Sequence, residues 1–178
     1  MTNTQVVTGE VRLSFVNVFE PKAVKEGDTP KYSVTAIIPK SDVKTVNAIK
    51  AAIQAAAENG AQKHFGGRVP TNVNNTFKDG DTEVDDLGEL KKIKYPEYND
   101  SYYIRLSTKF PPKVLDANRQ EILDPTELYS GCYGRVSMTF FAYSGDGRRG
   151  VSASLNNVMK TRDGEPLTNM LSGDEFGE

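Results

Sequence analysis

The order of apolar and polar positions predicts β-strands through most of the chain. Five segments alternate between apolar and polar side chains, or are rich in β-branched and aromatic residues, as expected for strands with one buried face. Pro21 and Pro39 are expected to end the first two strands, and the turn sequence from Ser144 to Gly147 joins the last two into a hairpin. The predicted strands cover residues 10–19, 31–38, 101–110, 132–143 and 148–160.

One segment, after the second predicted strand, has the period of an amphipathic helix. It is expected to begin with Ser41 as its N-cap and Asp42 in the first turn, and to end near Gly60. By contrast, residues 66–100 have the composition of a long irregular loop. Several strands with one helix predict a mainly β protein, either a small barrel or an α+β sheet. The apolar face of the helix is expected to carry Val43, Val46, Ile49, Ile53 and Ala57.

The composition limits the chemistry that the chain can perform. Its 178 residues suffice for one domain with extensions, and they include one cysteine and one histidine. We therefore expect no disulfide framework, no cysteine or histidine metal site, no conventional catalytic triad and no cofactor, so the protein is predicted not to be an enzyme. Cys132 is expected to be a small buried core residue. No segment has the roughly 20 apolar residues needed to span a bilayer, and the N-terminus has no signal pattern, so neither membrane insertion nor export is expected.

Charge is distributed unevenly along the chain, although the formal net charge is only −2. Residues 79–100 and residues 163–178 each carry −5, and the remaining residues together carry +8. A basic body with acidic extensions favours a polyanionic ligand. The carboxylates from Asp79 to Glu89 allow a second interpretation, a Mg²⁺ site like those of nucleases, although their spacing favours a solvated acidic loop.

Two predicted strands and the hairpin turn place aromatic and basic side chains on a face opposite the core. Such a face suits single-stranded nucleic acid, because bases stack on aromatic rings while cations follow the phosphates. The alternative is that the aromatic residues are buried under the helix or under residues 66–100, and that the arginines are ordinary surface residues. The predicted primary contacts are Tyr103, Arg105, Lys109, Arg135, Phe141, Tyr143, Arg148 and Arg149, and the secondary candidates are Arg12, Lys31, Tyr32 and Lys160.

Seven short segments, in order along the chain, carry a resemblance to a known family. Together they resemble a family of tailed-bacteriophage single-stranded DNA-binding proteins that was first catalogued as a domain of unknown function. The likeness extends over nearly the whole chain. The segments are Thr8–Pro21, Pro30–Val34, Ile37–Asp42, Ile122–Pro125, Tyr129–Tyr133, Leu155–Val158 and Arg162–Leu167.

The resemblance implies an OB-fold, a five-stranded barrel, over residues 1–162, with a long insert at 66–100 and a flexible acidic tail at 163–178. It implies that the protein binds and protects single-stranded DNA with little sequence preference during phage DNA replication, recombination or repair, in the cytoplasm of the infected bacterium. It also implies that the tail binds replication or recombination proteins. The usual OB-fold has its helix after the third strand, whereas the predicted helix follows the second. The tail residues matching the family's partner-binding pattern are Asp174, Glu175 and Phe176.

Three alternatives stay open on the sequence alone. A phage structural or adaptor protein would use a small barrel for protein contacts. Duplex DNA or RNA would be attracted by the same cations, because neutralisation of phosphates is common to all nucleic acids. The sequence does not determine the oligomeric state, and a homo-oligomer is compatible with it.

Overall fold

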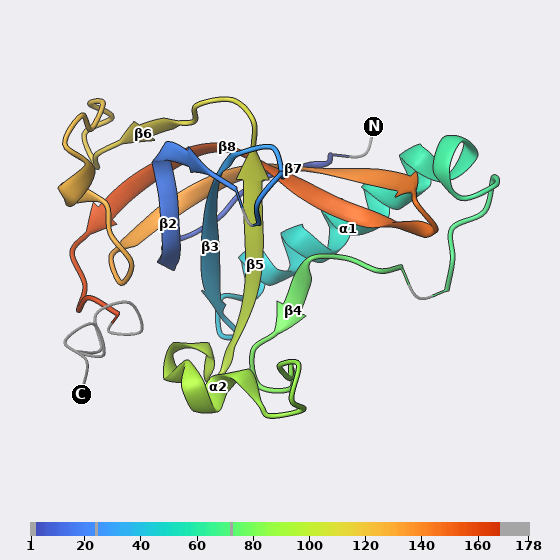
Figure 1. The fold of residues 1–178 in the computed structure, drawn as a ribbon, viewed down its shortest axis with the longest axis horizontal. Helices are drawn as coiled ribbons and strands as arrows, with labels where there is room; N and C mark the ends of the chain where they lie inside the picture. The colour runs from blue at the N-terminus through green and yellow to red at the C-terminus, as the bar shows by residue number, and fades with distance from the viewer. Residues whose placement is uncertain (1–2, 24, 72, 168–178) are drawn as a thin grey trace.

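The computed structural model describes residues 3–23, 25–71 and 73–167, and it confirms the five predicted strands (Figure 1). The predicted end of the first strand at Pro21 is wrong, because that strand continues to Lys22. Its pairing with the next strand is irregular between Asn17 and Lys22, and a proline is tolerated where the ladder of hydrogen bonds is broken. The five strands are β2 (Val11–Lys22), β3 (Lys31–Pro39), β5 (Ser101–Thr108), β7 (Tyr133–Gly145) and β8 (Arg148–Arg162).

Several shorter elements were not predicted, because three or four residues are too few to show a period. The segment 66–100, expected to be irregular, contains a strand, an α-helical turn and a 3₁₀ turn. The short elements are β1 (Gln5–Val7), β4 (Phe77–Asp79), α2 (Lys91–Lys94), η1 (Pro96–Tyr98), β6 (Lys113–Leu115) and η2 (Pro125–Glu127).

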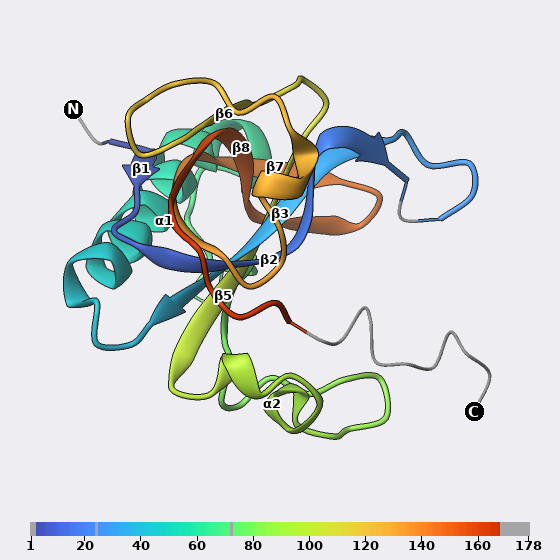
Figure 2. The ribbon, with the colours of Figure 1, turned by 90° about the vertical axis from the view of Figure 1, so that its left-hand side faces the viewer.

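The five long strands close into a ring, which confirms the predicted barrel (Figures 1 and 2). β2 pairs with β3, β3 with β5, β8 with β7, and β7 with β2, all antiparallel. The ring is closed by β5 and β8, which run parallel and pair at Ser107 and Ser154. Five strands closed in this way form the barrel of an OB-fold. β1 and β6 extend the sheet by pairing with β7 and β8.

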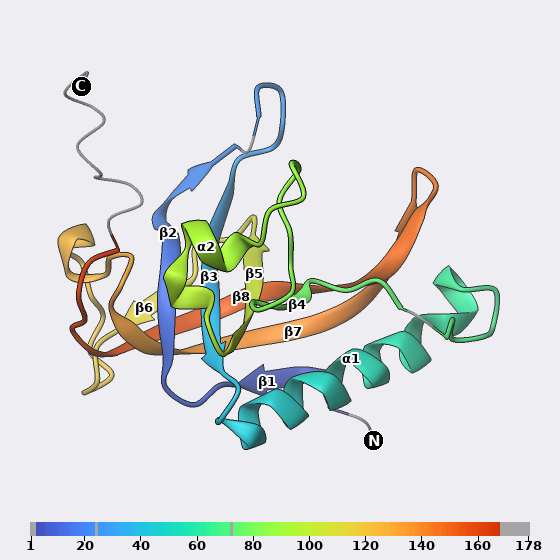
Figure 3. The same ribbon diagram turned by 90° about the horizontal axis from the view of Figure 1, so that it is seen from below.

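The main helix, α1 (Val43–His64), follows the second strand of the ring and packs along β7 (Figure 3). Its place in the chain therefore departs from the usual OB-fold order, as the sequence predicts. The N-cap is Asp42 rather than the predicted Ser41, since the Asp42 side chain accepts a hydrogen bond from the Thr45 backbone N–H at 3.2 Å. Helix and strand approach closely at Gly60, where a Cβ atom would lie 2.4 Å from the Cβ of Ala142.

The core lies inside the ring and between the ring and α1. Val136, Met138 and Phe140 are buried, which confirms the alternation predicted along β7. Cys132 is also buried, as predicted, and desolvation raises the pKa of its thiol. Val43 was expected on the apolar helix face but is 59% exposed, because Val46 and later residues make the contact with the barrel. Within the described residues, no helix has the length and apolarity needed to cross a membrane.

Candidate nucleic-acid interface

The face of β3 and β5 that points away from the barrel core carries polar residues in matched positions. Ser33 lies opposite Ser107, and Thr35 lies opposite Arg105. Because paired residues of antiparallel strands project to the same side, these side chains share one face. Three connections project on this side of the molecule, away from α1: the β2–β3 loop, the 79–98 segment and the β7–β8 hairpin (Figure 3). The face is therefore a floor between three walls.

A groove of about 570 Å³ opens at the end of β5. It forms because residues 109–112 leave β8 after the pair at Ser107 and rejoin it where Lys113 pairs with Asn157. Two aromatic side chains are exposed here, Phe110 at 77% and Phe141 at 44%. We call this hollow the β5–β8 groove. Its lining includes three predicted residues, Lys31, Lys109 and Phe141, together with Ser107, Thr108, Phe110, Pro111, Ser152, Ala153, Ser154, Leu155 and Asn156.

A second hollow, of about 320 Å³, lies at the other end of the same face. It is bounded on one side by residues 79–98, which we call the arm, and on the other by β2, β3 and β5. We call it the arm pocket. Its lining includes two predicted residues, Tyr103 and Arg105, together with Phe15, Thr35, Asp85, Lys91, Lys94, Tyr95 and Tyr98.

Tyr103 is covered by the arm rather than open to a ligand. Its side chain is only 8% exposed, and its ring stacks on that of Tyr98 with centroids 4.4 Å apart and planes 3° from parallel. Desolvation raises the pKa of the Tyr103 phenol, so the phenol stays neutral at physiological pH. The alternation along β5 places Tyr103 on the correct face, but its ring belongs to the arm's packing. Arg105, two residues further, is exposed.

The hairpin carries three further predicted residues. Arg148 and Arg149 are exposed at its tip. Tyr143 is half-buried, and its hydroxyl oxygen accepts a hydrogen bond from Asn74 Nδ2 at 3.3 Å. Asn74 also receives the Val151 N–H at its backbone carbonyl, at 2.8 Å, so the 73–75 segment holds the base of the hairpin. The two arginines therefore project from a supported ribbon.

Four predicted residues do not line either hollow. Arg12 donates to the backbone oxygens of Gly131 and Glu165, at 3.2 and 2.6 Å, and Arg135 donates to the Thr8 oxygen at 2.9 Å. These side chains are therefore bound to the protein's own backbone rather than turned toward the groove. The other two are Lys160, which pairs with Asp163 at 2.6 Å, and Tyr32, which lies on the same strand face as the core residue Val34.

The same contacts fasten the beginning of the predicted tail. Tyr129 Oη donates to Asp163 Oδ1 at 2.8 Å, and the Leu167 N–H donates to the Ser130 oxygen at 3.0 Å. The chain is thus attached to the barrel at least as far as Leu167, five residues into the tail as predicted. The expected partner-binding residues Asp174, Glu175 and Phe176 lie outside the described residues.

The cations at the two hollows and at the hairpin tip are not neutralised by the described part of the chain. Within that part, the ion pairs involve Lys40, Lys92, Lys160 and Arg162. The cations left without a carboxylate partner there would attract an anion at low desolvation cost, because both partners stay partly hydrated. They are Lys31, Lys91, Lys94, Arg105, Lys109, Arg148 and Arg149.

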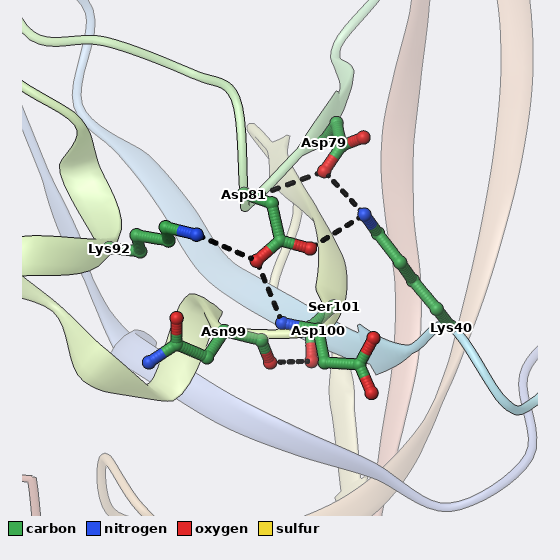
Figure 4. Close-up of polar contacts among 7 residues, drawn as sticks. All are labelled: Lys40, Asp79, Asp81, Lys92, Asn99, Asp100 and Ser101. Atoms are coloured by element: carbon green, nitrogen blue, oxygen red, sulfur yellow. Dashed lines mark hydrogen bonds and ion pairs between the residues drawn. The ribbon is translucent and has the colours of Figure 1, made fainter.

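The base of the arm is fastened to the end of β3 by ion pairs (Figure 4). Lys40 Nζ lies 2.8 Å from Asp79 Oδ1 and 2.7 Å from Asp81 Oδ2. Asp81 Oδ1 accepts the Asp100 backbone N–H at 3.0 Å, and Lys92 Nζ lies 3.5 Å from it. The hydrogen bond from Lys40, followed by that from the Asp100 N–H, lowers the pKa of the Asp81 carboxyl to about 2. We call these contacts the latch.

The latch changes the interpretation of the acidic insert. Asp79 and Asp81 were expected either in a solvated loop or, less favourably, at a Mg²⁺ site, and they instead bind lysine side chains. Over residues 3–23, 25–71 and 73–167, no group of three or more His, Cys, Asp or Glu side chains is arranged to hold a metal ion. The two carboxylates therefore have a structural role.

Five lining residues were missed by the sequence reasoning. Phe110 was assigned to the apolar face of the strand, but β5 ends at Thr108, so its ring leaves that face. Phe15 was also assigned to the core, but it has a φ of +48° within an irregular part of β2. Lys91, Lys94 and Tyr95 belong to the arm. A cluster of lysines next to a tyrosine, inside an otherwise acidic segment, was the available signal for them.

Comparison with known proteins identifies the family. A family model described as "Enterobacter phage Enc34, ssDNA-binding protein" matches residues 4–178. The chain belongs to this family. Another relative, protein p50 of Acyrthosiphon pisum secondary endosymbiont phage 1, is 31% identical over 182 residues, which span 98% of this chain and 93% of p50. The resemblance stated from the short sequence segments is thereby confirmed.

Solved structures show the same fold. The single-stranded DNA-binding protein from bacteriophage Enc34, solved in complex with ssDNA, matches with a TM-score of 0.76 and 24% identity, over 92% of this chain and 89% of that one. The single-stranded DNA-binding protein gp2.5 of bacteriophage T7 matches with a TM-score of 0.62 and 12% identity, over 98% of this chain and 94% of gp2.5. The barrel of the Enc34 family thus recurs at very low sequence identity.

Proposed function

We propose that this protein binds and covers single-stranded DNA with little sequence preference, as a non-enzymatic factor in phage DNA replication, recombination or repair in the cytoplasm of the infected cell. Membership of the Enc34 family supports the ligand class. The β5–β8 groove carries the proposal for where DNA lies. It combines two exposed phenylalanines with Lys31 and Lys109, neither of which has an ion-pair partner among the described residues.

The groove chemistry suits unpaired bases. Bases would stack on Phe110 and Phe141, each contributing about 1–3 kcal/mol, while Lys31 and Lys109 neutralise phosphates. Ser152, like the other hydroxyl and amide groups of the groove, can serve as donor or acceptor for any base, so little sequence preference is expected. Arg148 and Arg149 at the hairpin tip would extend the positive path.

The C-terminal residues are proposed to bind partner proteins. Asp174, Glu175 and Phe176 place carboxylates beside one aromatic ring at the end of the chain. Such a segment suits a basic surface with an apolar pocket on a replication or recombination protein. A variant ending at residue 167 should keep the described fold and lose co-purification with those host or phage proteins. Retention of the same partners by the truncated protein would contradict this role.

A competition titration tests the proposal directly. Fluorescently labelled oligo-dT is displaced by unlabelled single strands of mixed sequence, by duplex DNA and by RNA at fixed salt. We expect single strands to compete best, whatever their sequence, because stacking needs bases free of a duplex. Equal competition by duplex would show that the groove recognises only phosphates. Absence of binding at moderate salt would favour the adaptor role in protein contacts instead.

Phe141→Ala separates the stacking role from a core role. The ring is 44% exposed, so its loss should weaken oligo-dT binding by about 1–3 kcal/mol while changing the thermal unfolding midpoint only slightly. Phe65→Ala is a suitable contrast, because that ring is 4% exposed and packs in the core. If Phe141→Ala lowers stability as Phe65→Ala does and leaves affinity intact, the stacking assignment is wrong.

A further inference from the structure

We propose that the arm pocket is a second nucleotide-binding site, in which the acidic insert covers the DNA strand that leaves the β5–β8 groove. This inference rests on the proposed function, because it assumes a single-stranded DNA ligand. It assigns to the arm a role in DNA contact, whereas the charge of residues 79–100 alone, −5, suggests repulsion. The ligand groups expected there are one base and its neighbouring phosphate.

The two hollows lie along one strand. Ser107 lines the β5–β8 groove and Arg105 lines the arm pocket, and both project from the same face of β5. Two residues of a β-strand span about 7 Å. A DNA strand following β5 from the groove therefore reaches the arm pocket directly. Ser33 and Thr35 provide a continuous polar floor between the two positions.

The arm pocket contains both kinds of group that a nucleotide needs. Phe15 and Tyr95 are half-buried and meet edge to face, with centroids 5.8 Å apart, so part of each ring faces the hollow. Arg105 and Lys94 are exposed beside them and have no ion-pair partner in the described chain. A volume of about 320 Å³ is within the range of pockets that take small ligands.

The position of Phe15 is maintained against a backbone preference. Its φ of +48° falls in the left-handed region, which is unfavourable for a bulky aromatic residue. Such a conformation persists only where the surrounding structure determines it, and residues of this kind cluster at binding sites. Here the irregular pairing between Ser14 and Asn17 directs the Phe15 ring to the arm pocket.

The negative charge of the arm is largely directed away from the pocket. Asp79 and Asp81 are held in the latch by Lys40 and Lys92. The carboxylate that does line the pocket, Asp85, accepts the backbone N–H groups of Leu87 and Glu89 at 2.9 and 3.0 Å. The remaining charged groups lining the pocket are Lys91, Lys94 and Arg105, so its local charge is positive.

The latch fixes the arm in the position that forms the pocket. At its centre Gly80 passes so close to the neighbouring backbone that a Cβ atom would lie 2.4 Å from the Tyr98 oxygen and 2.6 Å from the Ser101 oxygen. Tyr98 and Tyr103 then stack beneath the arm, together with buried Ile37. A preformed site loses less entropy on binding than one that must fold around its ligand.

Affinity measurements on matched variants test the proposal, with an oligo-dT longer than the roughly 16 nucleotides that one OB-fold covers. Tyr95→Ala and Lys94→Ala should each weaken binding about five-fold or more. Two controls should bind as the unaltered protein does. Ile93→Ala changes an exposed side chain on the same helical turn that does not line the pocket, and Lys44→Ala removes the same charge as Lys94→Ala from the far side. Tyr95→Phe, which keeps the ring, should also bind normally.

Photocrosslinking supplies a second measurement that does not depend on folding of the Tyr95→Ala variant. Oligo-dT carrying iododeoxyuridine is irradiated with the full-length protein, which is then digested with trypsin. We expect DNA attached to the fragment from Tyr95 to Arg105, as well as to fragments containing Phe110 or Phe141. Crosslinks confined to the groove fragments, with normal binding by Lys94→Ala, would overturn the arm pocket and leave the proposed function intact. Absence of DNA binding by the unaltered protein would overturn both.

Discussion

Removing the two groove lysines gives a quantitative test of phosphate neutralisation. Lys31 and Lys109 both line the β5–β8 groove, and they follow in register from the pair Tyr32–Thr108. Each phosphate neutralised on a single strand contributes about 0.7 to the slope of log affinity against log salt. Lys31→Ala with Lys109→Ala should therefore flatten that slope by about 1.4. Between about 50 and about 500 mM salt, the unaltered protein should lose roughly 25-fold more affinity than the double variant.

The measurement is fluorescence anisotropy of labelled oligo-dT over a salt series. The matched control is Lys44→Ala with Lys63→Ala, which removes the same charge from α1, on the side of the molecule opposite the three projecting connections (Figure 3). Its slope should stay as in the unaltered protein, because distant charges are screened over about 10 Å at moderate salt. Equal slopes for the groove variant and the unaltered protein would refute the assignment of phosphates to these lysines.

Three further predictions concern the fold. Gly60→Ala should lower the unfolding midpoint, by overpacking of about 1–3 kcal/mol against the Ala142 Cβ at 2.4 Å, although the same change normally stabilises a helix interior; a raised midpoint would contradict the close packing. The pKa of Asp81 is lowered to about 2 from an ordinary 3.8, so its stabilisation is complete above about pH 4 and is lost as pH falls towards 2; Lys40→Met should flatten the unfolding midpoint over that range, and an unchanged profile would count against the latch. Cys132 is fully buried and desolvation raises its thiol pKa, so a thiol reagent should label it only at the rate of unfolding.

The barrel could be predicted because each long strand has one buried face. Along β7, the alternation at Val136, Met138 and Phe140 follows from the chain alone. In β8 the alternation shifts by one residue around Asn156, where the register with β7 changes. That irregularity depends on how two strands fit around a closed ring, so no local pattern in the sequence indicates it. The hairpin was therefore predictable, but its exact register was not.

The site could be predicted only in part, because the arm has no periodic pattern. The period of β5 places Tyr103 and Arg105 together on the outer face, as the structure confirms. Whether that face is open depends on where residues 79–98 fold back. Tyr98 covers Tyr103 and leaves Arg105 exposed, which is a tertiary contact between segments without strand or helix periodicity. Phe110 was misplaced by extending the alternation two residues beyond the end of the strand.

The charge count of the sequence also acquires a different meaning in the folded chain. The insert contributes −5, yet Asp79 and Asp81 are paired with lysines in the latch, while Lys91 and Lys94 lie at the arm pocket. Folding thus separates the two signs within one segment, with carboxylates at its base and cations over β5. A net charge of −2 therefore does not predict the potential that a ligand meets on this face. The salt dependence of binding measures that local potential directly, because counterion release depends on the cations in contact with phosphate rather than on the charge of the whole molecule.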